Sequence, residues 1–173
     1  MDAYESITTK RDIREFAKKQ VPGGVKMKIL EAARLTGSSM NAQHWRFILV
    51  QDRSNLGKLA ADSTSGSWVA GADFAVVILT NPKIPGYTID AGRVLQDMSL
   101  AAWNFGVVSC LFTGMKKDEL RRDFGIPPQM ETSAVLGFGY PKKRVLGKKN
   151  RQPIQELVYL ERYGNPVDPK DLA

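Results

Sequence analysis

The stretch from Asp90 to Phe112, DAGRVLQDMSLAAWNFGVVSCLF, decides the fold class because it predicts a buried helix followed directly by a buried strand. After Asp90, apolar residues recur at the i, i+3, i+4, i+7 spacing of one helix face, and only Arg93 and Asp97 are charged. So little charge is typical of a helix at the centre of a domain. We expect Asp90 to be its N-cap, Gly106 to end it, and a strand to occupy residues 107–112.

Outward from this helix, the remaining pattern predicts helices and strands in an irregular order. Gly37 is expected to cap the second predicted helix and Ser54 to be the N-cap of the third. Mixed elements without a regular strand–helix alternation indicate an α+β fold rather than a doubly wound parallel sheet. The predicted helices cover residues 2–8, 25–35, 54–61 and 115–124, the further strands cover residues 47–50, 74–79 and 134–140, and residues 155–160 form a last helix or strand.

Size and composition indicate an ordinary globular protein. The 173 residues fit one domain, and 43% apolar with 25% charged residues is a typical balance. No apolar run approaches the ~20 residues of a membrane span, and the N-terminus lacks the order of a signal peptide. We therefore expect a cytoplasmic protein without membrane contact. Cys110, the one cysteine, excludes an intramolecular disulfide and is interpreted as a small buried apolar residue.

The titratable residues exclude most classical catalytic sets. One histidine and one cysteine exclude most histidine-based metal centres, so no metal is expected. There is no phosphate-binding Walker loop, and His44 is interpreted as a loop histidine with a local hydrogen bond. A net charge of +7 comes largely from two basic clusters. The first contains Lys10, Arg11 and Arg14, and the second runs from Lys142 to Arg151 without an acidic residue.

The basic clusters leave nucleic acid, an acidic membrane surface, a phosphorylated ligand or a simple solvated face as alternatives. The basic residues form no helical stripe with interleaved aromatics, and no nucleic-acid reading motif is present, which disfavours nucleic acid. A phosphorylated aromatic cofactor suits the pattern better, since cations pair strongly with phosphate. Such an enzyme needs few catalytic side chains because the cofactor carries the chemistry.

Four motifs, in this order, resemble the FMN-binding nitroreductase family. The first is KRDIREF at residues 10–16, and the second is EAARLTGSSMNAQHWRF at residues 31–47. The third is QDMSLAAWNFG at residues 96–106. The last combines LGFGYP at residues 136–141 with KNRQPIQELV at residues 149–158. Each motif alone is weak, but together they cover almost the whole chain.

The resemblance implies an FMN site and a role for each matching residue. Arg14 would favour the reduced, anionic flavin, because a fixed cation stabilises the charged form. No other catalytic side chain is expected, since the flavin reacts. The FMN phosphate and ribityl chain would contact Lys10, Arg11, Asp12, Arg14, Lys149 and Arg151; backbone groups of Thr113 and Gly114 would face flavin N5; and Ser38, Ser39, Asn41 and Gln43 would reach the flavin from the partner subunit of a homodimer.

The same resemblance implies a fold and an activity. Residues 1–173 would form one domain, a central mainly antiparallel sheet flanked by helices, with residues 148–173 packing on the partner subunit. The enzyme would be an FMN-dependent NAD(P)H oxidoreductase that passes a hydride through flavin N5 to an electron-poor small-molecule aromatic acceptor, such as a nitroaromatic or a quinone. It would act by a ping-pong sequence.

Several positions depart from the family pattern. Thr36-Gly37 stands in place of Ala-Pro, His44 in place of the proline before Trp45, and Asp97 in place of Asn. Asp12 stands in place of the commoner Ser and also occurs in a branch that resembles flavin-destroying, dimethylbenzimidazole-forming enzymes. That activity, a flavin-storing or flavin-sensing role, and a basic nucleic-acid-binding protein therefore remain as alternatives.

Overall fold

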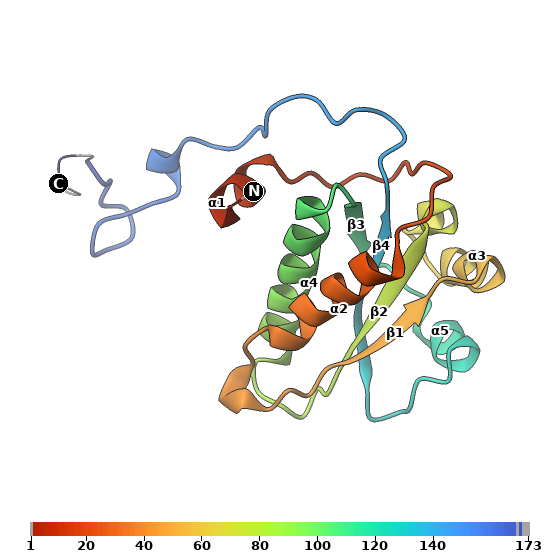
Figure 1. Cartoon of the computed structure of the whole chain (residues 1–173). Helices are drawn as coiled ribbons and strands as arrows, with labels where there is room; N and C mark the ends of the chain where they lie inside the picture. Colours follow the sequence, from red (N-terminus) through yellow and green to blue (C-terminus); the bar gives the residue numbers. More distant parts are fainter. Residues whose placement is uncertain (1, 169, 171–173) are drawn as a thin grey trace.

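The computed structural model describes residues 2–168 and residue 170. They form one antiparallel sheet with helices packed around it (Figure 1). Its four strands stand in the order β1-β2-β4-β3, and every neighbouring pair is antiparallel. The strands are β1 (Arg46–Val50), β2 (Phe74–Thr80), β3 (Val108–Phe112) and β4 (Glu131–Gly139). The α+β class and the antiparallel sheet are confirmed.

Helices cover both faces of the sheet (Figure 1). Side chains of α2 and α4 form one core with Phe74, Val76 and Ile78, whereas α3 and α5 pack on the alternate β2 residues of the opposite face. A strand that is buried on both faces is apolar throughout, which explains the unbroken apolar run of β2. The helices are α1 (Ala3–Thr9), α2 (Gly23–Leu35), α3 (Arg53–Ala61), α4 (Tyr87–Asn104) and α5 (Lys117–Asp123), and the 3-10 turns are η1 (Ser39–Asn41), η2 (Ser67–Gly71) and η3 (Ile154–Glu156).

The structure corrects three predicted helix boundaries. Helix α4 begins at Tyr87 after Gly86, so Asp90 lies inside its first turn and is not the N-cap. Helix α3 is capped by Asp52, whose carboxylate accepts the backbone N–H groups of Ser54 and Asn55. Gly37 does not cap α2, because the C-cap is Thr36; Gly37 lies next to the Arg93 guanidinium of α4.

After β4 the chain leaves the sheet, passes α1 and extends away from the body (Figure 1). The prediction of a helix or strand over residues 155–160 is wrong, because this range holds only the end of the short turn η3 and an isolated bridge from Tyr159 to Pro166. Apolar side chains of this segment are exposed, among them Ile154, Leu157 and Tyr163. Within the described residues, no helix has the length and apolarity needed to cross a membrane.

Candidate functional site

The first basic motif runs as an extended segment along the free edge of β3. Asp12 forms a parallel bridge with Ser109, and the Ile13 N–H donates to the Ser109 carbonyl at 3.0 Å. Phe16 then bridges Pro141 at the end of β4. This backbone pairing fixes the motif next to the strand end from which the second basic cluster begins.

The two basic clusters, far apart in sequence, meet in space. The Arg11 guanidinium donates to the Gly147 carbonyl, and the Lys149 ammonium donates to the Ile7 carbonyl. Burial lowers the pKa of Lys149, and the positive charges of Arg151, Lys10 and Arg11 lower it further. Asp12 opposes this effect and lies 2.5 Å from the Lys10 ammonium. The cations therefore outnumber the one carboxylate among them.

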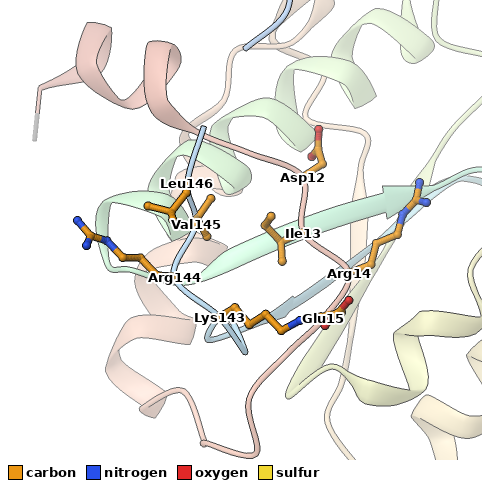
Figure 2. A pocket seen from close by; sticks show the side chains of 8 residues that line it. All are labelled: Asp12, Ile13, Arg14, Glu15, Lys143, Arg144, Val145 and Leu146. Carbon is orange, nitrogen blue, oxygen red and sulfur yellow. The ribbon is translucent and has the colours of Figure 1, made fainter. Parts of the chain in front are cut away.

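A cavity of about 460 Å³ lies beside this cluster (Figure 2). Ile13 gives it an apolar wall, Lys143 points toward Glu15, and Arg144 and Arg14 point to opposite sides (Figure 2). The cavity is lined by Asp12 to Glu15 and by Lys143 to Leu146. The lining thus combines three cations, two carboxylates and an apolar wall, which suits a ligand with an anionic and an organic part.

Arg14 is held by Cys110, whose sulfur lies 3.4 Å from the Arg14 Nε. This hydrogen bond, followed by the charge interaction with Cys110, raises the pKa of Arg14. An arginine is charged at neutral pH with or without this contact. Cys110 is buried as predicted. Its contact with Arg14 was not predicted, because the two residues are 96 positions apart.

Thr113 and Gly114 follow directly after β3. The Gly114 carbonyl accepts the Thr64 N–H at 2.9 Å, and a Cβ on Gly114 would lie 2.4 Å from Oγ1 of Thr64. Only glycine permits this approach. Thr113 is exposed and lines a second cavity of about 350 Å³ with Tyr87 and the Lys117–Glu131 ion pair.

The Ser38–Gln43 segment lies at the other end of α4 (Figure 1). The Ser39 N–H donates to Asp90 in the first turn of α4, whereas Trp103 in its last turn donates to Thr9, next to Lys10. The 13 positions from Asp90 to Trp103 correspond to about 20 Å of helix. The structure therefore does not bring this segment to the basic cluster within one chain.

His44 is buried and pairs with Asp90, so the prediction of a local hydrogen bond is wrong. Its Nε2 lies 3.1 Å from the Asp90 carboxylate, across 46 positions of sequence. Burial raises the pKa of Asp90, but hydrogen bonds from the Ser39 N–H, His44 and the Ser39 hydroxyl outweigh it, so the net pKa is lowered. This pair was not predicted from the sequence, because Asp90 fitted the pattern of an N-cap. The feature that could have indicated a buried partner for Asp90 is its place beside the apolar positions Ala91 and Val94.

Comparison with known proteins gives the class of this chain. The profile of the nitroreductase family matches residues 7–83 and 65–140. A protein of Archaeoglobus fulgidus, provisionally named an NADH dehydrogenase/NAD(P)H nitroreductase, is 32% identical over 150 residues, which cover 82% of this chain and 86% of the relative. The chain belongs to the nitroreductase family.

Two further comparisons agree with this membership. A similarly named protein of Methanothermobacter thermautotrophicus is also 32% identical over 150 residues, covering 82% of this chain and 78% of the relative. The solved structure of an FMN-dependent nitroreductase from Clostridium difficile superposes with a TM-score of 0.85. That structure is 22% identical, and the match covers 91% of this chain and 98% of the other. It shows that the two proteins share a fold.

Proposed function

We propose that the protein is an FMN-dependent oxidoreductase that accepts a hydride from NAD(P)H and passes it to an electron-poor aromatic acceptor. The observation that carries this proposal is the meeting of two basic clusters, one before β1 and one after β4, beside a partly apolar cavity. The names of the archaeal relatives and of the Clostridium difficile structure support the same cofactor and reductant.

The basic cluster fits the phosphate of FMN. A phosphate monoester carries a charge of about −1.5 to −2 at neutral pH and accepts strong charge-assisted hydrogen bonds. Without an anion, burial lowers the pKa of Lys149, and crowding by Arg151, Lys10 and Arg11 lowers it further. A bound phosphate would offset part of this positive charge and stabilise the protonated Lys149.

The residues next to the cluster fit the rest of the cofactor. When bound, FMN would supply hydride transfer at N5, so the protein needs to bind, orient and tune rather than to react. Arg14, held in place by Cys110, presents a permanent positive charge that favours an anionic ring beside it. Gly114 carries no side chain, so the backbone after β3 lies directly against Thr64 and Ser65.

The site is completed, in this proposal, by a second copy of the chain. Ser38, Ser39, Asn41 and Gln43 lie about 20 Å along α4 from the basic cluster of their own chain. They would reach the flavin of the partner in a homodimer. The extended segment from residue 148 would pack on that partner. Its own exposed side chains, such as Ile154 and Leu157, would then be buried.

The proposal is tested by the spectrum of the purified protein and its response to reductant. We expect a yellow protein that binds FMN, loses its visible absorbance when NADH or NADPH is added without oxygen, and regains it with a nitroaromatic or a quinone. A protein that cannot be reconstituted with FMN would overturn the proposal. Binding of FMN without reduction by either nicotinamide would instead favour storage or sensing, and loss of the flavin under oxygen would favour flavin destruction.

A further inference from the structure

Except for Asp12, the positions at which this chain departs from the family pattern lie on or against one face of α4. The Thr36 hydroxyl lies 2.7 Å from the Asp97 carboxylate, Gly37 packs on Arg93, and His44 pairs with Asp90. Residues 90, 93 and 97 follow the i, i+3, i+7 spacing of one helix face. The polar side of α4 therefore contacts the linker between α2 and β1 near both of its ends.

Asp90 holds both ends of one turn. Its carboxylate accepts the Ser39 N–H at 2.9 Å, where the turn begins, and contacts His44 Nε2 at 3.1 Å, where the turn ends. The Asp90 side chain is 1% exposed and that of His44 is 3% exposed, so water does not compete for these bonds. A buried carboxylate with several donors is held rigidly.

The hydrogen bonds of His44 also define its tautomer. The Asn81 N–H donates to His44 Nδ1 at 3.3 Å, so Nδ1 is the acceptor and the ring proton lies on Nε2. Nε2–H then donates to Asp90. The imidazole thus joins three segments, namely the turn, the loop that follows β2 and the first turn of α4.

The turn itself has an unfavourable backbone. Met40, Asn41 and Gln43 have φ values of 53°, 52° and 45°, in the left-handed region that favours glycine. Within the turn, the Gln43 N–H donates to the Ser38 hydroxyl at 2.9 Å. Such a conformation persists only where the surrounding structure determines it, and the contacts with Asp90 and His44 do so here.

We propose that His44 and Asp90 are positioning residues that hold the Ser39–Gln43 turn in its flavin-binding conformation, a role that rests on the proposed function. The turn carries Ser39, Asn41 and Gln43, which the proposed homodimer presents to the FMN of the partner. Because the free chain already holds the turn, FMN binding need not order it, and affinity is higher for a preformed site.

Two substitutions of His44 separate its hydrogen bond with Asp90 from its hydrogen bond with Asn81. The side-chain nitrogen of His44→Gln can replace Nε2 as a donor to Asp90, whereas the oxygen of His44→Asn can replace only the Nδ1 acceptor. Asp90→Asn removes the acceptor for Nε2–H. Thr36→Val is the matched control, since it removes a hydrogen bond between the same linker and α4 but lies before the turn.

Two measurements are made on each variant: amide hydrogen exchange of residues 39–43 in the FMN-free chain, and the FMN dissociation constant. We expect H44N and D90N to exchange faster in the turn and to bind FMN at least about tenfold more weakly. H44Q should stay near the parent in both. T36V should lose thermal stability while its turn exchange and FMN affinity stay unchanged.

Equal behaviour of H44N and H44Q, or unchanged exchange in the turn of both H44N and D90N, would overturn the positioning role. Weaker FMN binding by T36V at the same loss of stability would also overturn it, because the effect would then be a general one. A parent chain that does not bind FMN would instead overturn the proposed function, and the exchange measurement would still test the contact itself.

Discussion

Lys149 lies where the two basic clusters of the chain meet, and its pKa depends on the positive charges around it. Its pKa is lowered by burial and by Arg151, Lys10 and Arg11. Between the lowered pKa and the ordinary 10.5, the unfolded chain binds more protons at this position than the folded chain. The free energy of unfolding of the FMN-free protein therefore gains a contribution that increases as the pH rises through this window.

This pH dependence can be measured by urea denaturation of the FMN-free protein at increasing pH up to 10.5, the ordinary value for lysine. We expect the contribution from Lys149 to vanish in Lys149→Met. Saturating inorganic phosphate should reduce it too, since an anion stabilises the protonated lysine. A parent and a K149M variant with the same pH dependence would contradict the crowding.

Adjacent lysines provide a test of the phosphate contact at the same scale. Lys149 is half-buried in the cluster, whereas Lys148 is exposed. We expect K149M to weaken FMN binding by about tenfold or more, because a charge-assisted hydrogen bond contributes about 1.5–3 kcal/mol. Lys148→Met removes the same charge and should change the affinity little. Fluorescence titration of FMN measures both, and equal losses would point to long-range attraction instead.

Among the single elements, α3 shows which of two nearby polar residues, Asp52 or Ser54, caps its N-terminus. Asp52 accepts the Ser54 N–H at 2.9 Å and the Asn55 N–H at 3.2 Å. The Ser54 hydroxyl, followed by the Asn55 N–H, lowers the pKa of Asp52. The stabilisation is therefore present above the pKa of the unfolded chain and is lost as the pH falls through the lowered value.

Asp52→Ala should lower the Tm of the protein by about 2–4 °C at neutral pH, the usual effect of a lost N-cap in a chain of this size. Ser54→Ala should lower it less, because the Asp52 carboxylate still accepts both backbone N–H groups. The Tm difference between parent and D52A should shrink in acid. A larger loss in S54A than in D52A would restore Ser54 as the cap.

The central strands are joined by an aromatic pair. Phe74 of β2 and Phe138 of β4 are cross-strand partners, and their rings stack with centroids 4.7 Å apart. Both are fully buried. Phe138→Ala should reduce the free energy of unfolding by about 3–5 kcal/mol, measured by denaturant titration. An unchanged free energy of unfolding would contradict a role of this stacked pair in the core.

In the molecule as a whole, the tail, residues 148–168, is the segment whose apolar side chains stay exposed in a single chain. Ile154, Leu157, Val158 and Tyr159 are exposed on a segment that extends away from the body. Exposed apolar side chains gathered in one segment are typical of a protein–protein contact. A second copy in a homodimer would bury them, and it would also bring the Ser39–Gln43 turn to a basic cluster.

A chain that ends after Arg151 tests this arrangement, since it keeps Lys149 and Arg151 but lacks the apolar tail. In sedimentation velocity we expect a dimer for the full chain and a shift toward monomer for the shortened chain. FMN affinity should fall together with dimerisation, although the phosphate contacts remain. A shortened monomer that binds FMN as tightly as the parent would show that one chain is sufficient.

Local patterns in the sequence were sufficient to predict the main helices and strands up to β4, their order and the α+β class. The 3.6-residue spacing after Asp90 and the apolar run of β2 arise from contacts between near neighbours, so they can be recognised locally. The motifs that resemble the nitroreductase family identified it correctly. The predictions of helix N-caps at Asp90 and Ser54 were wrong because a cap depends on one or two residues, and several nearby polar residues fit the N-cap preference equally well.

The tertiary structure decided which distant residues meet. The pairs of His44 with Asp90 and of Arg14 with Cys110 join residues 46 and 96 positions apart, and no local pattern predicts such pairs. The same packing separates Ser39 from Lys10 by the length of α4. The physical reason is that backbone geometry is set by near neighbours, whereas buried polar contacts form only after the helices pack on the sheet and exclude water.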